Sequence, residues 1–189
     1  MTHRPLWLAA CAGAALAFFV LPAAAQTQML PGLWEHSFTP QAGSPMASAM
    51  KSAQEQLAGL TPAQRRQMDT LMAGKGVAMG SGPQGNAIRM CLTQAQIDLD
   101  EVPQGDRACA RQSVQRIGDT MKVRFSCAGS PPVAGEGEIT VLSPTAYKGT
   151  SILTTTTPAG KTERTQIEQS GQWLAKDCGS VKPLVSPGK

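Results

Sequence analysis

Five cysteines are the residues of this sequence with the most distinctive chemistry, and their spacing limits what that chemistry can be. Cysteine thiolates bind zinc, form redox pairs or close structural disulfides. The chain has no C-x-x-C pair, which zinc sites and redox sites commonly use, and only two histidines, His3 and His36. This pattern favours structural disulfides over a metal or a redox centre, provided that the chain is exported to an oxidising compartment.

The first 25 residues have the features of a secretory signal peptide. Basic His3 and Arg4 precede an apolar run over residues 6–21, and the segment ends in an A-x-A pattern at Ala25. We expect cleavage after Ala25 and a periplasmic product. The apolar run is short for a membrane span, which needs about 20 residues, and no later segment comes close, so we expect no membrane span in the mature chain.

Cys11 needs a separate interpretation, because residues 8–11 read Leu-Ala-Ala-Cys and resemble a lipoprotein cleavage box. Such a box follows the apolar region, whereas here the strongest apolar stretch comes after Cys11. We therefore interpret Cys11 as part of the signal peptide, with a lipid-anchored product as the alternative. Its removal leaves four cysteines for two disulfides, namely Cys91, Cys109, Cys127 and Cys178.

The segment between Cys109 and Cys127 is centred on Gly118 and predicts a β-hairpin. A three-residue loop over 117–119 would place the two cysteines directly opposite each other, at a separation that a disulfide spans. A two-residue loop at 118–119 would turn them to opposite faces unless a bulge compensates. We expect the Cys109–Cys127 bridge, with Cys91 paired to Cys178.

The mature chain reads as a single, mainly β domain over residues 26–182, with a flexible tail at 183–189. Short alternating runs from residue 87 onward, joined by Gly- and Pro-containing turns, predict an antiparallel β-meander that is curled or barrel-like. Residues 46–73 differ, because apolar side chains recur there at spacings of three and four. They predict a helical hairpin inserted after a first strand around Trp34.

Methionines form two i, i+4 pairs in this insertion, Met46 with Met50 and Met68 with Met72. Methionine makes adaptable apolar contacts, so the four side chains, together with Trp34, are our candidates for binding a small apolar ligand or an envelope protein. Two alternatives stay open. Thioether sulfur also suits Cu(I), and methionines at helical spacing often only pack a helix onto a core.

Catalysis finds little support in the sequence. A Ser–His–acid set would have to use His36, which lies beside Trp34 on a strand, and no G-x-S-x-G motif is present. Glu136 and Glu138 lie two apart on one strand face, which we interpret as solvated edge charges rather than a catalytic pair. We expect no enzyme activity and no cofactor, with an enzyme that lacks a recognisable motif as a further alternative.

Nucleic acid is a poor fit to the composition. The net charge is +4, the basic residues are scattered, and aromatic residues make up 4% of the chain, so there is neither a basic patch nor a stacking platform.

Several landmarks occur in a characteristic order along the mature chain. They are Pro31-Gly32-Leu33-Trp34-Glu35, Met90-Cys91-Leu92-Thr93, Gly135-x-Gly137, Tyr147-x-Gly149 and Gly171-x-Trp173-Leu174-x-x-Asp177-Cys178-Gly179. The chain thereby resembles the domain-of-unknown-function family DUF 3617, small exported proteins of Gram-negative bacteria, over nearly its whole mature length. The resemblance implies a periplasmic home and transfers no catalytic residue. The function we expect is a non-catalytic binding or envelope-support module.

Overall fold

The computed structural model describes residues 27–82, 87–98, 109–129, 131–156 and 160–183. Its elements, in chain order, are β1 (Gly32–Pro40), α1 (Pro45–Ala58), α2 (Pro62–Gly74), β2 (Val77–Met79), β3 (Ala87–Leu92), α3 (Gln94–Asp98), β4 (Cys109–Ile117), β5 (Thr120–Cys127), β6 (Val133–Ser143), β7 (Ala146–Thr156) and β8 (Thr162–Ala175). The predicted signal peptide and residues 184–189 of the predicted tail lie outside the described residues. Pro183, the first tail residue, pairs with Cys91 in an isolated parallel bridge.

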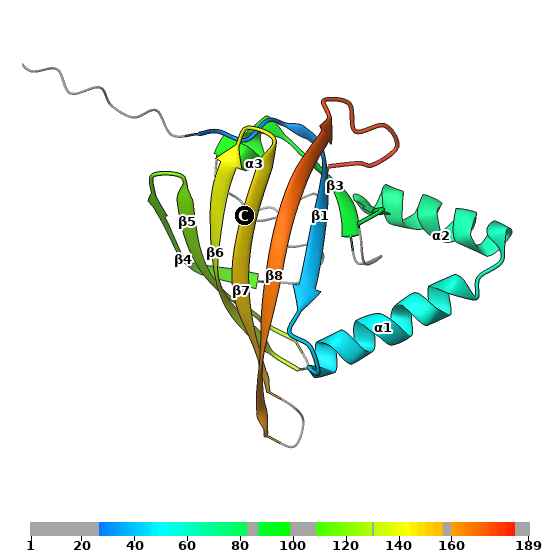
Figure 1. The fold of residues 1–189 in the computed structure, drawn as a ribbon, viewed down its shortest axis with the longest axis horizontal. Coiled ribbons are helices and arrows are strands. Elements are labelled where there is room, and N and C mark those ends of the chain that lie inside the picture. Colours follow the sequence, from blue (N-terminus) through cyan, green and yellow to red (C-terminus); the bar gives the residue numbers. More distant parts are fainter. Residues whose placement is uncertain (1–26, 83–86, 99–108, 130, 157–159, 184–189) are drawn as a thin grey trace, which may run out of the picture.

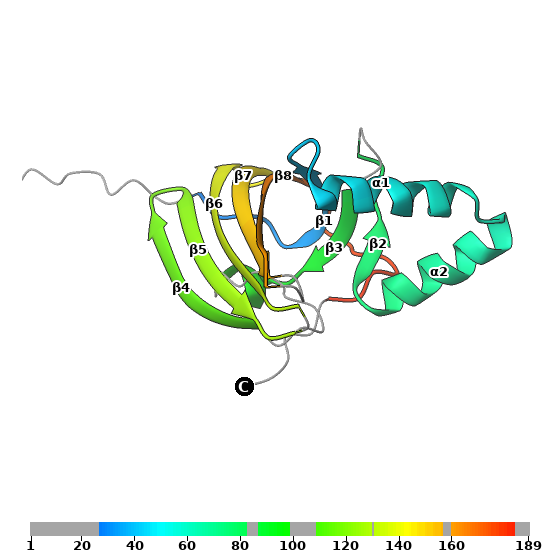
Figure 2. The same cartoon turned by 90° about the horizontal axis from the view of Figure 1, so that it is seen from below.

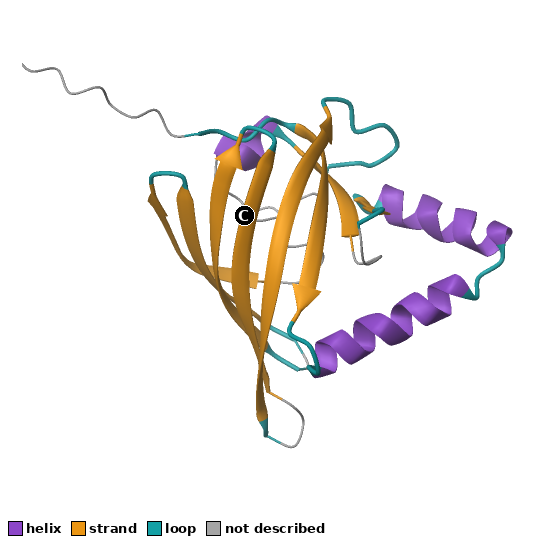
Figure 3. Ribbon diagram, viewed as in Figure 1, coloured by secondary structure: helices purple, strands orange, loops and turns teal. Residues whose placement is uncertain are grey.

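One antiparallel sheet of eight strands forms the body of the protein, in the order β2-β3-β1-β8-β7-β6-β5-β4 (Figures 1 and 3). From β4 to β8 the strands follow one another as a meander, and β1 then joins the free side of β8. The sheet is strongly curved, as Figure 2 shows. Among the described residues its two end strands, β2 and β4, do not pair with each other, so the sheet is curled but not closed. The predicted mainly β fold with a helical insertion is confirmed.

The two faces of the sheet differ in burial, because side chains alternate between them along each strand. One face, called the inner face below, carries Trp34, Tyr147 and Val141, all buried. Ile97 of α3 packs against this face, and α3 lies at the sheet end where β6 turns into β7 (Figure 1). The opposite, outer face is mostly exposed.

The outer face corrects one expectation. Glu136 and Glu138 are not edge charges, since β6 is an interior strand between β5 and β7. Glu138 forms an ion pair with Lys122 at 3.3 Å, and Glu136 pairs with Arg124 and Arg164 at 3.8 and 3.5 Å. These exposed cross-strand pairs keep the outer face polar and contribute little stability each.

The β4–β5 hairpin adopts the second of the two predicted solutions, a two-residue loop with a compensating bulge. Ile117 is opposite Thr120, so the loop has two residues, Gly118 and Asp119, rather than three. The register shifts between Arg111 and Ser113, which makes Gln112 the extra residue of a bulge. The bulge restores the alignment, and Cys109 is the partner of Cys127.

The bulge also explains the polar residues of β4. After it, Val114 and Arg116 lie on the face of Cys127, opposite Val123 and Met121, while Ser113 and Gln115 turn to the outer face. Cys127 is disulfide-bonded. The side chain of Cys109 lies outside the described residues, so the Cys109–Cys127 bond stays a prediction.

The helical insertion begins and ends close to the predicted residues 46–73. Ser44 caps α1 by accepting the N–H of Ala47, and Thr61 forms a capping box with Gln64 at the start of α2. Two short elements were not predicted. They are β2, in the Gly-rich segment after α2, and α3, which follows β3.

Candidate functional site

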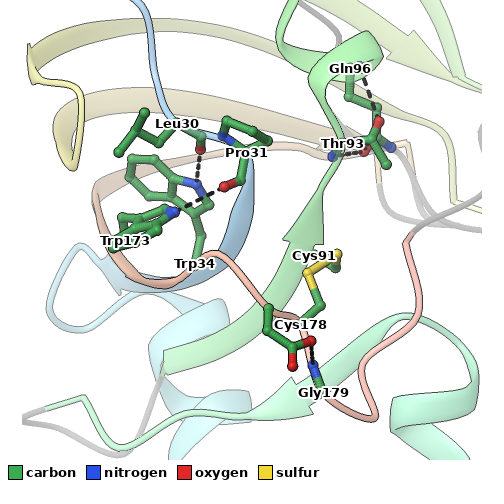
Figure 4. The surroundings of a disulfide bond; sticks show 10 residues. Leu30, Pro31, Trp34, Cys91, Thr93, Gln96, Trp173, Cys178 and Gly179 are labelled. Carbon is green, nitrogen blue, oxygen red and sulfur yellow. Dashed lines mark hydrogen bonds between the residues drawn. A yellow bond between two sulfur atoms is a disulfide. The ribbon is translucent and has the colours of Figure 1, made fainter.

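Three of the five landmark segments meet at one end of the sheet, which we call the motif end, defined by residues 30–35, 91–93 and 171–179 (Figure 4). Trp34 and Trp173 are register partners there. The indole N–H of Trp34 donates to the carbonyl of Leu30 at 2.8 Å, and that of Trp173 donates to the carbonyl of Pro31 at 3.1 Å. Both indoles therefore fix the turn that leads into β1.

Local contacts explain why glycine stands at position 32 and glutamate at position 35 of the same motif. Gly32 has a φ of 134°, and a Cβ there would overlap the carbonyl oxygen of Ala175. The carboxylate of Glu35 accepts the backbone N–H of Ser81 at 2.9 Å and the Nε–H of Arg89 at 3.0 Å. These bonds, that from Ser81 first, lower the pKa of Glu35 and tie the segment after β2 to the sheet.

The other two segments of the motif end, residues 91–93 and 171–179, are held by a disulfide and by side chains that accept backbone N–H groups. Cys91 and Cys178 form a disulfide, as predicted. Thr93 and Gln96 form reciprocal hydrogen bonds at the start of α3, between each backbone N–H and the other side chain (Figure 4). Asp177 accepts the N–H of Gly179 at 2.9 Å, the turn contact expected for an aspartate at this place.

The polar side chains of these motifs thus bond to one another or to the backbone. Such an arrangement builds a frame, and none of these contacts resembles a nucleophile–base pair. The motif end holds together β1, β3 and the end of β8.

A buried polar pair lies on the inner face beside this frame. Tyr147 Oη and His36 Nδ1 are 2.6 Å apart, and their side chains are 7% and 4% exposed. Trp34, which is fully buried, has its ring centroid 6.4 Å from that of His36 and 6.0 Å from that of Tyr147. The three rings form one cluster.

Gly171 makes this pair possible. It is the register partner of His36 on one side and of Tyr147 on the other, so all three residues lie in one row across β1, β8 and β7. A Cβ at Gly171 would overlap the Tyr147 ring. Because the glycine has no side chain, the tyrosine lies across β8 and reaches the histidine two strands away.

Burial sets the protonation of both partners. It lowers the pKa of His36 to about 4 and raises the pKa of Tyr147. At neutral pH the imidazole and the phenol are therefore both uncharged. Among the described residues, Nε2 of His36 is buried without a hydrogen-bond partner. His36 therefore has a hydrogen-bond partner at one of its two ring nitrogens.

The helical pair is a second candidate site, with a different character. Both helices extend away from the β2 side of the sheet and cover neither of its faces (Figures 1 and 2). None of the α1 residues is buried, and Ala73 is the one buried residue of α2. The alternative in which the methionines pack the helices onto the sheet core is therefore not seen. Met46, Met50, Met68 and Met72 are all half-buried.

A cavity of about 360 Å³ lies between these helices and the end of β2. Its apolar lining comes from Leu57, Met68 and Met79, and its polar lining includes Arg65 and Asp69. Met46, Met50 and Met72 do not line it, and Trp34 lies in the sheet core. The structure therefore brings one of the five predicted binding residues to this cavity and separates Trp34 from the methionines.

Three further observations concern the rest of the described residues. A shallow polar depression of about 690 Å³ covers the outer face, lined by hydroxyl, amide and charged side chains such as Thr150, Glu168 and Lys148. In the described part of the chain, no group of three or more His, Cys, Asp or Glu residues could hold a metal ion. The helices within that part include none that is long and apolar enough to cross a bilayer.

Sequence reasoning missed Tyr147 and Gly171 as site residues. The signal was present, since Tyr147 is the one tyrosine of the chain and both residues belong to the landmarks of the resemblance. Their meaning depends on which strands are neighbours, which spacing along the chain does not reveal.

Comparison with known proteins gives a family and no activity. The chain is 36% identical over 121 residues to a Pseudomonas putida protein described as "Uncharacterized protein in lpd-3 5'region", an alignment that covers 61% of this chain and 80% of the relative. No solved structure matches. The family model described as "Protein of unknown function (DUF3617)" matches residues 29–178. The match runs from Met29, just before the first landmark, to Cys178 of the disulfide. The chain therefore belongs to the DUF3617 family.

Proposed function

We propose that this chain is a non-catalytic binding protein of the bacterial periplasm, and that its helical pair binds an apolar segment of a protein partner. The observation that carries the proposal is the position of the pair: its two helices cover neither face of the sheet, and Ala73 is their one buried residue.

The energetics of the two helices support this use. Helices of 14 and 13 residues gain most of their stability from packing an apolar face, since isolated helices of this length are marginal in water. Among the strands, α2 contacts mainly the short strand β2, and α1 makes few contacts, with β1. Leu71 is 70% exposed. A partner that covered the apolar faces would supply the packing that the sheet does not.

The cavity between the helices suits a polypeptide. A volume of about 360 Å³ accepts one or two apolar side chains, and Leu57, Met68 and Met79 provide the apolar walls. Methionine side chains adapt to differently shaped partners. Arg65 donates to the backbone carbonyl of Leu57 at 2.8 Å, which holds the two helices together across the cavity. Arg65 and Asp69 can also bond to the polar backbone of a bound peptide.

The periplasmic location rests on the signal sequence and on the disulfide. Residues 1–25 read as a secretory signal peptide. The Cys91–Cys178 bond is the kind that persists in oxidising compartments, of which the periplasm is one. The absence of catalysis is supported by the motif side chains, which are engaged in bonds that hold the fold.

Site-specific photo-crosslinking in living cells tests the proposal. A photo-reactive phenylalanine derivative replaces Ala58, an exposed residue at the cavity rim, or Thr150, an exposed control on the outer face. We expect a discrete protein adduct from position 58 and none from position 150. In the position-58 chain, Met68→Gln should lower the adduct yield at least tenfold, while Met68→Leu, which keeps the apolar volume, should preserve it.

Equal adducts at both positions, or no protein adduct at either, would overturn the proposal. Native mass spectrometry of the purified chain then separates the alternatives. A retained organic molecule would favour a small apolar ligand, and one or two copper ions on the oxidised chain would favour Cu(I) binding by the methionines.

A further inference from the structure

In the buried His36–Tyr147 pair on the inner face, one polar atom makes no hydrogen bond within the described residues. His36 Nδ1 is bonded to Tyr147, while Nε2 is buried and, within the described part of the chain, unpartnered. Native proteins leave few such atoms, and each one points to an occupant or to a function. His36 is 4% exposed, so bulk water does not satisfy this nitrogen.

The hydrogen bond to Tyr147 determines which proton the imidazole carries. If Nδ1 donated to the phenol oxygen, both the phenolic hydrogen and the Nε2 lone pair would lack partners. If the phenol donates to Nδ1, only the Nε2 hydrogen lacks one. The second arrangement leaves fewer unsatisfied groups, and burial keeps the phenol protonated. His36 is therefore the Nε2–H tautomer, a neutral donor.

The environment limits which acceptor this donor can bind. In its row His36 lies between Ile88 and Gly171, and its aromatic neighbours are Trp34 and Tyr147. The N–H of Trp34 is already used by Leu30. A carboxylate at Nε2 would lose its hydration for a single bond to a neutral donor, which is unfavourable, and the nearby cation Arg116 already donates to the carbonyl oxygens of Gly118 and Thr27. A neutral oxygen loses far less.

Free volume is present one layer of side chains away from this cluster, since none of the three rings lines the cavity but two of their neighbours do. A cavity of about 80 Å³ on the inner face is walled mainly by apolar side chains and includes Leu92, which packs with Trp34 and Tyr147, and Val141, the register partner of Tyr147. Its polar lining consists of Gln28, Gln96 and Arg116. A space of this size holds a short hydrocarbon segment or a few water molecules.

We propose that His36 Nε2–H is the donor of an internal binding position that holds a neutral oxygen acceptor. The oxygen comes either from a small apolar molecule with a carbonyl, ether or hydroxyl group, whose hydrocarbon part lies in the adjoining cavity, or from a buried water molecule. This position is separate from the helical pair, and it stands whether or not that pair binds a partner.

The first test is an NMR experiment on the mature chain labelled with ¹⁵N-histidine. His36 is its one histidine once the signal peptide is removed, so a single imidazole is observed. At pH 7 we expect the Nε2–H tautomer, with a resolved Nε2–H proton that exchanges slowly. The opposite tautomer, or an imidazolium, overturns the proposal.

The second measurement identifies the occupant. A cross-relaxation peak from the Nε2–H proton to the water resonance indicates buried water. An organic molecule retained in native mass spectra, together with peaks to protons that belong to no residue of the chain, indicates a bound apolar ligand. A slowly exchanging Nε2–H with neither kind of peak overturns the proposal.

Two variants separate the bound molecule from the fold. Ile97→Trp fills the cavity from the short helix α3 and leaves the imidazole in place. We expect retention of the organic molecule to fall at least tenfold while the Nε2–H tautomer persists. Unchanged retention would show that the molecule does not lie in this cavity. Tyr147→Phe removes the donor to Nδ1 and should lose the fixed tautomer, whichever occupant is present.

Discussion

The motif end of the sheet and the helical pair differ in how completely their side chains are engaged. At the motif end, Trp34, Trp173 and Asp177 each bond to backbone groups, and a disulfide joins β3 to the segment after β8. In the helical pair Ala73 alone is buried, and the regular apolar spacing serves no packed core. The side chains of the motif end therefore build a frame, whereas those of the helical pair are left largely uncovered by the sheet. Substitutions in the two regions should differ accordingly.

The largest effect should come from the disulfide. Replacing Cys91 and Cys178 by alanine releases a loop with a sequence separation of 87 residues. In the chain-entropy description this raises the entropy of the unfolded chain enough to lower the free energy of unfolding by about 4–5 kcal/mol. Equilibrium urea unfolding of the oxidised protein and of the double variant measures the difference. A loss below about 1 kcal/mol would show that the motif end holds without its covalent bond.

The next effect is a dependence on pH centred on His36. The unfolded chain has a histidine pKa near 6.5, and burial lowers the folded value to about 4. Between these values the unfolded chain binds a proton that the folded chain does not. The stability contribution is therefore complete above about pH 6.5 and falls as the pH drops toward 4, by about 3 kcal/mol in all.

Urea unfolding at several pH values between 7 and 4.5 checks this prediction. His36→Gln removes the titrating group and keeps a polar side chain, while the carboxylates, which also titrate at the acid end, are the same in both proteins. Tyr147, the titratable side chain in contact with His36, stays neutral throughout this range. Equal slopes for the two proteins would show that the imidazole is not protected by the fold.

The outcome for the hairpin shows how far sequence reasoning reaches. A bridge requires Cys109 and Cys127 to face each other, and they do. Two solutions satisfied that requirement, a three-residue loop or a two-residue loop with a bulge. Local turn preference selects the second, since Gly118 adopts a φ of 59° in a tight turn. The sequence predicted the alignment because a covalent bond demands it, but not the way in which the backbone achieves it.

The two candidate sites show where such reasoning ends. The apolar spacing of residues 46–73 predicted both helices, but spacing shows that a face is apolar and not what covers it. His36 and Tyr147 are 111 positions apart and meet because β8 lies between their strands and carries a glycine at the crossing point. That contact follows from strand order, which local patterns do not encode.

A pair of glycine substitutions compares the two regions directly. Gly171→Ala places a methyl group where the Tyr147 ring lies, so the ring must move and its bond to His36 must weaken. We expect a loss of about 2 kcal/mol in the free energy of unfolding. Gly74→Ala, at the end of α2, meets nothing within 4 Å and should raise the stability by about 0.5 kcal/mol. Changes of the same sign in both variants would contradict the contrast between frame and helices.

The smallest effect is expected on the helical pair itself. Leu71→Gln replaces a side chain that is 70% exposed, and glutamine is as good a helix former, so unfolding should change by no more than about 0.5 kcal/mol. The informative comparison is between two possible environments of Leu71, an exposed one and a packed core. If Leu71 faced a core that forms in solution, the same change would cost about 2 kcal/mol or more, as large apolar truncations in cores do. A near-zero effect on unfolding, combined with a lower crosslinking yield at position 58, would mean that this leucine contributes to binding and not to folding. A large loss of stability would instead place the pair against the sheet and would remove the physical basis for a free binding surface.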